Sequence, residues 1–148
     1  MHPTAARLAE RLRARGLQIE VRTLSDSART APLAASALGV QVGQIVKSLL
    51  FLRGDEPVMV LCAGDRRVDA ERLGLRPAPA DRVRAATGFS IGGVPPLGHD
   101  VRLPTTIDES LRRFEVVWAA AGTPHEVFAI DTDALIGALP DAEVTAVS

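Results

Sequence analysis

Apolar positions along the chain follow two spacings, which predict a mixture of helices and strands. Between residues 4 and 15 the apolar side chains recur every three or four positions, which predicts an amphipathic helix with Thr4 as its cap and Gly16 as its end. Capping residues and short apolar faces predict further helices at 30–39, 69–75, 81–87 and 132–139, with a helical turn starting at 108–109.

The most apolar stretch of the chain predicts a buried β-hairpin. Residues 45–52 and 58–62 are almost wholly apolar, and the turn-forming segment 54–57 separates them. Further strands are predicted at 20–24, 101–103, 115–120 and 126–130. Because no repeat or linker interrupts these elements, the sequence predicts one α+β domain with a mixed, mostly antiparallel sheet.

Composition and charge exclude several classes of protein. With 148 residues, 47% of them hydrophobic and 24% charged, the chain can bury one core, which excludes wholesale disorder. A net charge of −1 argues against DNA or long RNA as a partner held by bulk charge. No apolar run reaches the roughly 18 residues of a membrane span, and the N-terminus lacks the apolar segment of a signal peptide. A lone Cys62 excludes an internal disulfide framework, so a reducing cytoplasm is the expected compartment.

The 17 basic residues divide into 16 arginines and one lysine, Lys47, in the middle of the predicted strand 45–52. A coding bias toward arginine would leave Lys47 as an accident, whereas a need for a compact ammonium would make it a constrained residue. An unpaired ammonium in such an apolar strand costs several kcal/mol. We therefore expect Lys47 to pair with a buried carboxylate, to reach the end of the sheet or to line a polar cavity that takes an anionic ligand, and we favour the cavity.

A glycine- and proline-rich loop at 92–98 is the second candidate site. Its glycines would let a ligand approach the backbone, and its prolines would hold free N–H groups in one orientation. The loop lacks the Gly-Lys-Ser/Thr ending of a nucleotide P-loop and the spacing of a dinucleotide fingerprint, which excludes both. A rigid surface turn explains the same composition equally well.

Isolated polar residues give weaker candidates. His125 follows Gly122 in a predicted loop, where an imidazole can position a hydroxyl or move a proton, although most isolated histidines are ordinary surface residues. Neither Ser27 nor Ser48 has the glycine neighbours of a serine nucleophile. The histidines have no Cys or His partner at ligand spacing, so neither a metal nor another cofactor is expected.

Arginines gather in two places. Arg7, Arg11 and Arg15 recur every four residues, so they form one stripe on the predicted first helix, and six more arginines lie within 66–84. We interpret the stripe as a solvated helix face rather than an RNA contact. The second group is interpreted as mixed surface, because acidic residues dilute it.

Three motifs resemble those of one known family and occur in its order. They are Ile45-Val46-Lys47-Ser48-Leu49-Leu50-Phe51, Gly92-Gly93-Val94-Pro95-Pro96-Leu97-Gly98 and Ala121-Gly122-Thr123-Pro124-His125. Together they resemble the YbaK family, the free-standing relatives of the prolyl-tRNA synthetase editing domain, over roughly residues 17–139. The resemblance implies one such domain over 1–148, with a barrel-like sheet flanked by helices.

The resemblance also implies an activity, the hydrolysis of the ester that joins a wrong amino acid to the 3′ end of a tRNA. The implied substrate is most often tRNA for proline that carries Ala, Cys or another small amino acid. The tRNA 2′-hydroxyl would assist the attacking water. The CCA end of aminoacyl-tRNA and prolyl-tRNA synthetase are the implied partners, and the choice between monomer and homodimer stays open.

The same resemblance implies roles for individual residues. Lys47 would hold the terminal phosphate and adenosine. Gly92, Gly93 and Pro96 would place the aminoacyl carbonyl and the water, and His125 matches the histidine of the family's last loop. Substrate contacts are implied for a second set of residues: Ser27, Ser48, Val94, Pro95, Gly98 and Gly122. A non-catalytic RNA- or protein-binding module of the same fold and a small-molecule esterase are the rival hypotheses.

Overall fold

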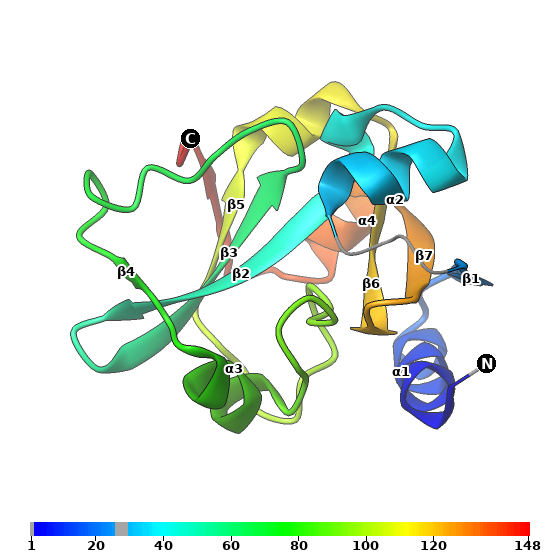
Figure 1. Ribbon diagram of the computed structural model, residues 1–148, viewed down its shortest axis with the longest axis horizontal. Coiled ribbons are helices and arrows are strands. Elements are labelled where there is room, and N and C mark those ends of the chain that lie inside the picture. Colours follow the sequence, from blue (N-terminus) through cyan, green and yellow to red (C-terminus); the bar gives the residue numbers. More distant parts are fainter. Residues whose placement is uncertain (1, 26–29) are drawn as a thin grey trace.

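The computed structural model describes residues 2–25 and 30–148 and shows an α+β fold, as the sequence predicts (Figure 1). The helices of these described residues are α1 (Pro3–Ala14), α2 (Ala31–Leu38), α3 (Ala80–Thr87) and α4 (Thr132–Gly137), with the 3-10 helices η1 (Val42–Gln44) and η2 (Glu109–Arg113). Across the same ranges no helix combines the length and the apolar character needed to span a bilayer.

The described strands form two sheets. An antiparallel sheet has the order β1-β7-β6, with β1 at Glu20–Thr23, β7 at Glu126–Asp131 and β6 at Val116–Thr123. A mixed sheet has the order β4-β2-β3-β5-β8, with β4 at Arg76–Pro77, β2 at Val46–Arg53, β3 at Glu56–Ala63, β5 at Thr105–Asp108 and β8 at Glu143–Thr145. One parallel bridge, between Ile45 and Trp118, joins the two sheets. The mixed, mostly antiparallel pairing is confirmed, but its strands do not close into a barrel.

The predicted hairpin of β2 and β3 is the longest feature of the mixed sheet (Figure 1). Gly54 and Asp55 form its two-residue turn, where Gly54 has a positive φ of 63° that glycine adopts without strain. The register places Lys47 opposite Cys62. The hairpin thus packs Lys47 beside a strand that is buried over most of its length, while Lys47 itself is partly exposed.

Caps at the ends of the first two helices differ in how well they were predicted. His2, and not Thr4, caps α1, because His2 Nδ1 accepts a hydrogen bond from the Thr4 N–H at 3.1 Å. Thr30 caps α2 as predicted, since its Oγ1 accepts from the Leu33 N–H at 3.3 Å. The apolar face of α1 is buried as its spacing predicts.

Two predicted elements were wrong. The segment 69–75 is a series of turns, in which Asp69 Oδ1 accepts from the Arg72 N–H at 3.3 Å and the chain reverses at Gly74. A helix of seven residues gains too few hydrogen bonds to offset its nucleation unless tertiary packing supports it. The segment 101–103 is irregular, and the strand begins at residue 105 instead. Burial decides this, because Ile107 is fully buried whereas Val101 is 63% exposed.

Strand β8, which the sequence pattern does not predict, pairs with β5 and leads to an anchored C-terminal segment. The buried carboxylate of Asp108 accepts from the Val147 N–H at 2.8 Å and from the hydroxyls of Ser110 and Ser148. Burial raises the pKa of Asp108, but these hydrogen bonds outweigh it and leave the pKa below its usual value. The carboxylate therefore stays charged and holds residues 147–148 against the mixed sheet.

Candidate active site

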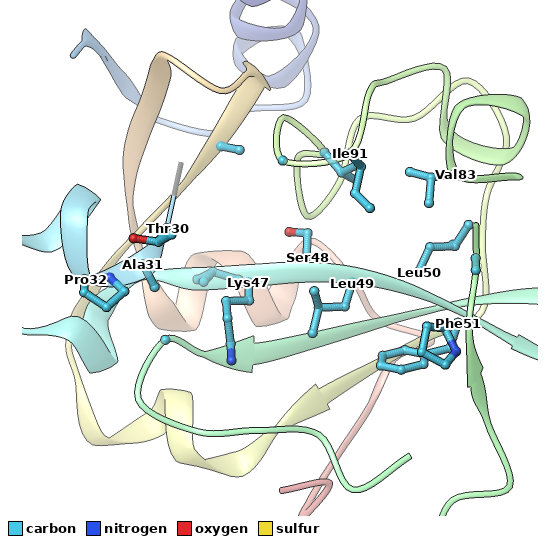
Figure 2. A pocket seen from close by; sticks show the side chains of 17 residues that line it. Thr30, Ala31, Pro32, Lys47, Ser48, Leu49, Leu50, Phe51, Val83 and Ile91 are labelled. Carbon is cyan, nitrogen blue, oxygen red and sulfur yellow. The ribbon is translucent and has the colours of Figure 1, made fainter. Parts of the chain in front are cut away.

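A cavity of about 660 Å³ lies along β2, between the start of α2 and the loop that follows α3 (Figure 2). Its walls come from segments far apart in the sequence. They are residues 30–32, 46–51 of β2, Gly64 after β3, Pro77 and Ala78, Val83 of α3, the loop residues Ile91, Gly92 and Val94, and Ala120 of β6.

The cavity runs along one edge of β2 rather than across one of its faces. Six consecutive residues, 46–51, line it, although successive side chains of a strand point to opposite faces. Among the described residues, this edge of β2 pairs with β4 at Phe51 and Leu52, and the residue before β2, Ile45, forms a bridge to Trp118 of β6. Between these points no described strand pairs with the edge around Ser48. The backbone of β2 therefore faces the cavity where Lys47 and Ser48 lie.

Lys47 lines this cavity, as we expected, and has no ion-pair partner among the described residues. Its Nζ donates a hydrogen bond to the carbonyl of Arg66 in the loop after β3. An ammonium has three donors, so this contact leaves two for a ligand. Figure 2 shows Lys47 and Ser48 pointing to opposite sides of β2, and they therefore bracket the open edge of the strand.

The hydroxyl of Ser48 is buried and has no hydrogen-bond partner in the described part of the chain. Figure 2 shows it pointing toward the side on which Ile91 lies. A buried hydroxyl without a partner costs about 1–3 kcal/mol. Besides Lys47, the cavity therefore offers a ligand the unused hydroxyl of Ser48, close to an apolar part of the wall that includes Leu50, Val83 and Val94.

The loop 92–98 is not a surface turn. Val94 and Leu97 are 5% and 2% exposed and belong to the main apolar core. Gly92, by contrast, is exposed at the cavity. The loop is therefore held from behind by core side chains while Gly92 faces the cavity.

The two adjacent glycines of this loop serve different geometrical needs. Gly92 has a φ of 89°, in the left-handed region that side chains other than glycine rarely adopt. Gly93 packs against the end of β6, where a Cβ would lie 2.9 Å from Thr123 Cα and 3.1 Å from the Gly122 carbonyl oxygen. The loop and the β6–β7 hairpin thus meet backbone to backbone, which brings the second and third sequence motifs together.

His99 anchors the far end of the loop, a role that its sequence context does not reveal. Its Nε2 lies 2.7 Å from the Pro95 carbonyl oxygen and therefore donates to it, and its ring packs edge-on against Phe89. Burial lowers the pKa of His99, partly offset by this hydrogen bond. The neutral imidazole is thus the form that holds the loop.

Acidification should destabilise the folded protein through protonation of His99. The pKa of His99 is lower in the folded than in the unfolded protein. Its contribution to the free energy of unfolding is therefore complete above about pH 6.5 and is lost as the pH falls below that value. Urea unfolding at pH 7.5 and 5.0 should show a smaller pH effect in His99→Gln, whose amide can donate to Pro95 but cannot titrate. An equal pH effect in both proteins would contradict this role.

Several predicted site residues do not line the cavity. Pro96 and Gly98 line a different depression, and the carbonyl of Gly98 accepts from Arg11 of α1 at 2.6 Å. His125 is exposed in the turn between β6 and β7, where its carbonyl accepts from the Leu24 N–H at 2.7 Å. The remaining predicted residues Gly93, Pro95 and Gly122 do not line the cavity either, and Ser27 lies outside the described residues.

Sequence reasoning missed other residues of the cavity wall. Thr30 shows in the sequence only as a helix cap and Val83 only as an apolar helix position. Gly64 has no signal of its own, but a Cβ there would lie 2.9 Å from Ala31 Cβ, so only glycine lets α2 approach β3. Such pairings depend on tertiary contacts that no local pattern reports.

The cavity walls carry no carboxylate, imidazole or thiol side chain among the described lining residues. The thiol nearest in register, Cys62, is buried on β3, and burial raises its pKa to about 11. That pKa keeps Cys62 protonated near neutral pH, so it does not act as a nucleophile. The available chemistry is an ammonium, a free hydroxyl and backbone groups, which suits the binding and polarisation of a ligand rather than covalent catalysis.

Comparisons with known proteins agree with the order of the three motifs. The sequence profile of the aminoacyl-tRNA editing domain matches residues 25–138. The chain is 34% identical to the uncharacterised protein YwhH of Bacillus subtilis, over 70% of this chain and 71% of that one. It is also 34% identical to proline–tRNA ligase of Lactobacillus gasseri over 62% of this chain, a stretch that makes up 18% of the ligase.

A solved structure described as a candidate trans-editing enzyme for prolyl-tRNA synthetase superimposes on the whole chain. The TM-score is 0.91 and the sequences are 42% identical, over 100% of this chain and 98% of the other. The likeness therefore extends beyond the motifs to the arrangement of all the elements around the cavity.

Proposed function

Because this chain belongs to the aminoacyl-tRNA editing domain family, we propose that it is a deacylase of mischarged aminoacyl-tRNA. The proposed substrate class is tRNA for proline that carries Ala, Cys or another small amino acid. The observation that carries the proposal is the cavity on the open edge of β2, where Lys47 and Ser48 have unused donors and the described wall provides no base to activate a nucleophile. The whole chain, 1–148, would act as one editing domain.

The proposed reaction needs positioning more than it needs acid or base side chains. A water oxygen attacks the aminoacyl carbonyl carbon, the bond from that carbon to the ribose 3′-oxygen breaks, and the leaving oxygen takes up a proton. The adjacent 2′-hydroxyl of the tRNA assists the water. An activated ester requires little beyond alignment and stabilisation of the developing oxyanion, so a site without a nucleophile suffices.

In this scheme each part of the cavity has a role. Lys47 holds the terminal phosphate and adenosine with its free ammonium donors, and Ser48 donates to a polar atom of the aminoacyl ester. The backbone of Gly92 places the carbonyl and the attacking water, and Gly93 holds Gly92 in position by packing against the end of β6. Pro96 and His125 would likewise act indirectly, because neither lines the cavity.

The apolar part of the wall supports a small amino acid as the group removed. Val83, Val94 and Ala120 offer no hydrogen bond to an amino acid side chain. A synthetase gains only about 1–3 kcal/mol from one methylene, so small amino acids escape its first selection and need a second, hydrolytic one. The CCA end of the tRNA is the proposed partner, with prolyl-tRNA synthetase as the enzyme whose errors are corrected.

The test is hydrolysis of tRNA for proline charged with Ala, Cys, Ser, Thr or Pro. We expect release of the small amino acids and at least a 10-fold lower rate with Pro, which corresponds to about 1.4 kcal/mol in the transition state. A terminal 2′-deoxyadenosine should lower the rate, whereas a general esterase would hydrolyse free amino acid esters equally well. Absence of hydrolysis across the panel would favour a non-catalytic binding module.

A further inference from the structure

A second depression, of about 350 Å³, lies between α1 and the end of α3. Its lining includes three guanidinium groups, those of Arg7 and Arg11 on α1 and of Arg84 on α3, together with Phe89 and one carboxylate, Asp100. Three positive charges therefore face one negative charge, on a chain whose net charge is −1. The excess of positive charge is local and not a property of the whole protein.

The three arginines differ in how many hydrogen bonds and ion pairs they form within the protein. Arg11 is held by the Gly98 carbonyl and by Asp100, 2.6 Å and 3.0 Å away. Arg84 donates to the Ser90 hydroxyl at 2.7 Å and has no carboxylate partner among the described residues, and the Arg7 side chain has no polar contact there at all. Two of the three charges are thus left for a ligand, which departs from the solvated stripe that the sequence alone suggested.

Neighbouring residues of the same two elements line the depression and the cavity. On α3, Val83 lines the cavity and the next residue, Arg84, lines the depression. In the loop that follows, Phe89 belongs to the depression and Ile91 to the cavity. Figure 1 shows α1 and α3 on the same side of β2, and the segment 83–91 contributes residues to both the cavity and the depression.

We propose that Arg7 and Arg84, with Arg11 beside them, bind the phosphodiester backbone of the tRNA next to its CCA end. This inference rests on the proposed function for the identity of the RNA. Guanidinium groups bind phosphate through paired N–H donors, and such contacts add affinity without reading sequence. The depression would hold the acceptor strand while the cavity holds the terminal aminoacyl-adenosine.

Charge reversal tests the proposal on two substrates of different length. In Arg7→Glu/Arg84→Glu, KM for aminoacyl-tRNA should rise at least 10-fold with kcat within about twofold, and KM for an aminoacyl-CCA trinucleotide should stay unchanged. The slope of log Kd for tRNA against log salt should fall by about 0.7 for each phosphate that the variant no longer neutralises. Arg112→Glu, the same change at an exposed position of η2, should leave both substrates unaffected.

Anisotropy with uncharged tRNA separates this inference from the proposed function, because it needs no catalysis. A 10-fold weaker Kd in the double variant, with the Arg112→Glu control unchanged, would support the inference even if the wild type hydrolysed no ester. Equal binding by all three proteins would overturn it. An equal effect on the trinucleotide, or equally effective competition by polyglutamate of matched charge, would also overturn it, the latter in favour of an acidic protein partner.

Discussion

Replacement of Lys47 by methionine should lower kcat/KM for mischarged tRNA by about 100-fold, because hydrogen bonds from an ammonium to a phosphate contribute about 1.5–3 kcal/mol. Methionine keeps the aliphatic stem on β2 and removes only the ammonium. Because Nζ contacts the Arg66 carbonyl and no carboxylate within the described residues, the substitution leaves no buried charge without a partner. Single-turnover deacylation, together with urea unfolding, measures the effect on activity and on folding separately.

Lys47→Arg is the matched variant that distinguishes shape from charge. A guanidinium is planar and larger than an ammonium, so we expect activity to fall by about 10-fold or more despite the retained charge. Full activity of Lys47→Arg would show that position 47 needs only a positive charge. A requirement for an ammonium would then not explain why this residue is a lysine. Full activity of Lys47→Met would contradict the assigned site altogether.

Local sequence patterns predicted the helices and strands whose stability comes from residues close to one another in the chain. The hairpin of β2 and β3 follows from two apolar runs around a turn, and α2 follows from its cap at Thr30. The wrong elements, at 69–75 and 101–103, are short segments whose conformation depends on distant contacts. The Asp69 N–H, for example, donates to Val147 near the end of the chain, which no spacing rule anticipates.

The sequence pointed to one residue of the candidate site, because a single charged side chain interrupts an apolar strand. Lys47 stood out because an ammonium in a two-sided apolar strand needs a reason. The free edge of β2 could not be predicted in the same way, because it depends on β4 ending its pairing at Phe51 and on the pairing of β6 with Ile45, just before β2. The anchoring role of His99 was missed because its partners, Pro95 and Phe89, are fixed by the packing of the loop.

Gly93→Ala should lower kcat/KM about 100-fold, because a displacement of about 1 Å in a positioning element has an effect of that size. The added Cβ would lie 2.9 Å from Thr123 Cα and 3.0 Å from its carbonyl carbon. Both are backbone atoms, so no side chain rotation relieves the contact, and the loop 92–98 or the end of β6 must move. The displacement would carry Gly92 away from the cavity, which deacylation kinetics would detect.

Substitutions at two other glycines serve as controls, one for the added methyl group and one for backbone strain. Gly137→Ala adds a methyl group with no atom within 4 Å and should leave activity unchanged. Gly92→Ala also meets open space, but its φ of 89° should cost about 1–2 kcal/mol in strain. If contact between the two backbones positions the loop, Gly93→Ala loses activity while Gly137→Ala does not, and a crystal structure of Gly93→Ala shows the loop displaced. Wild-type kinetics in Gly93→Ala would instead mean that the loop tolerates movement and that the backbone of Gly92 does not place the ester.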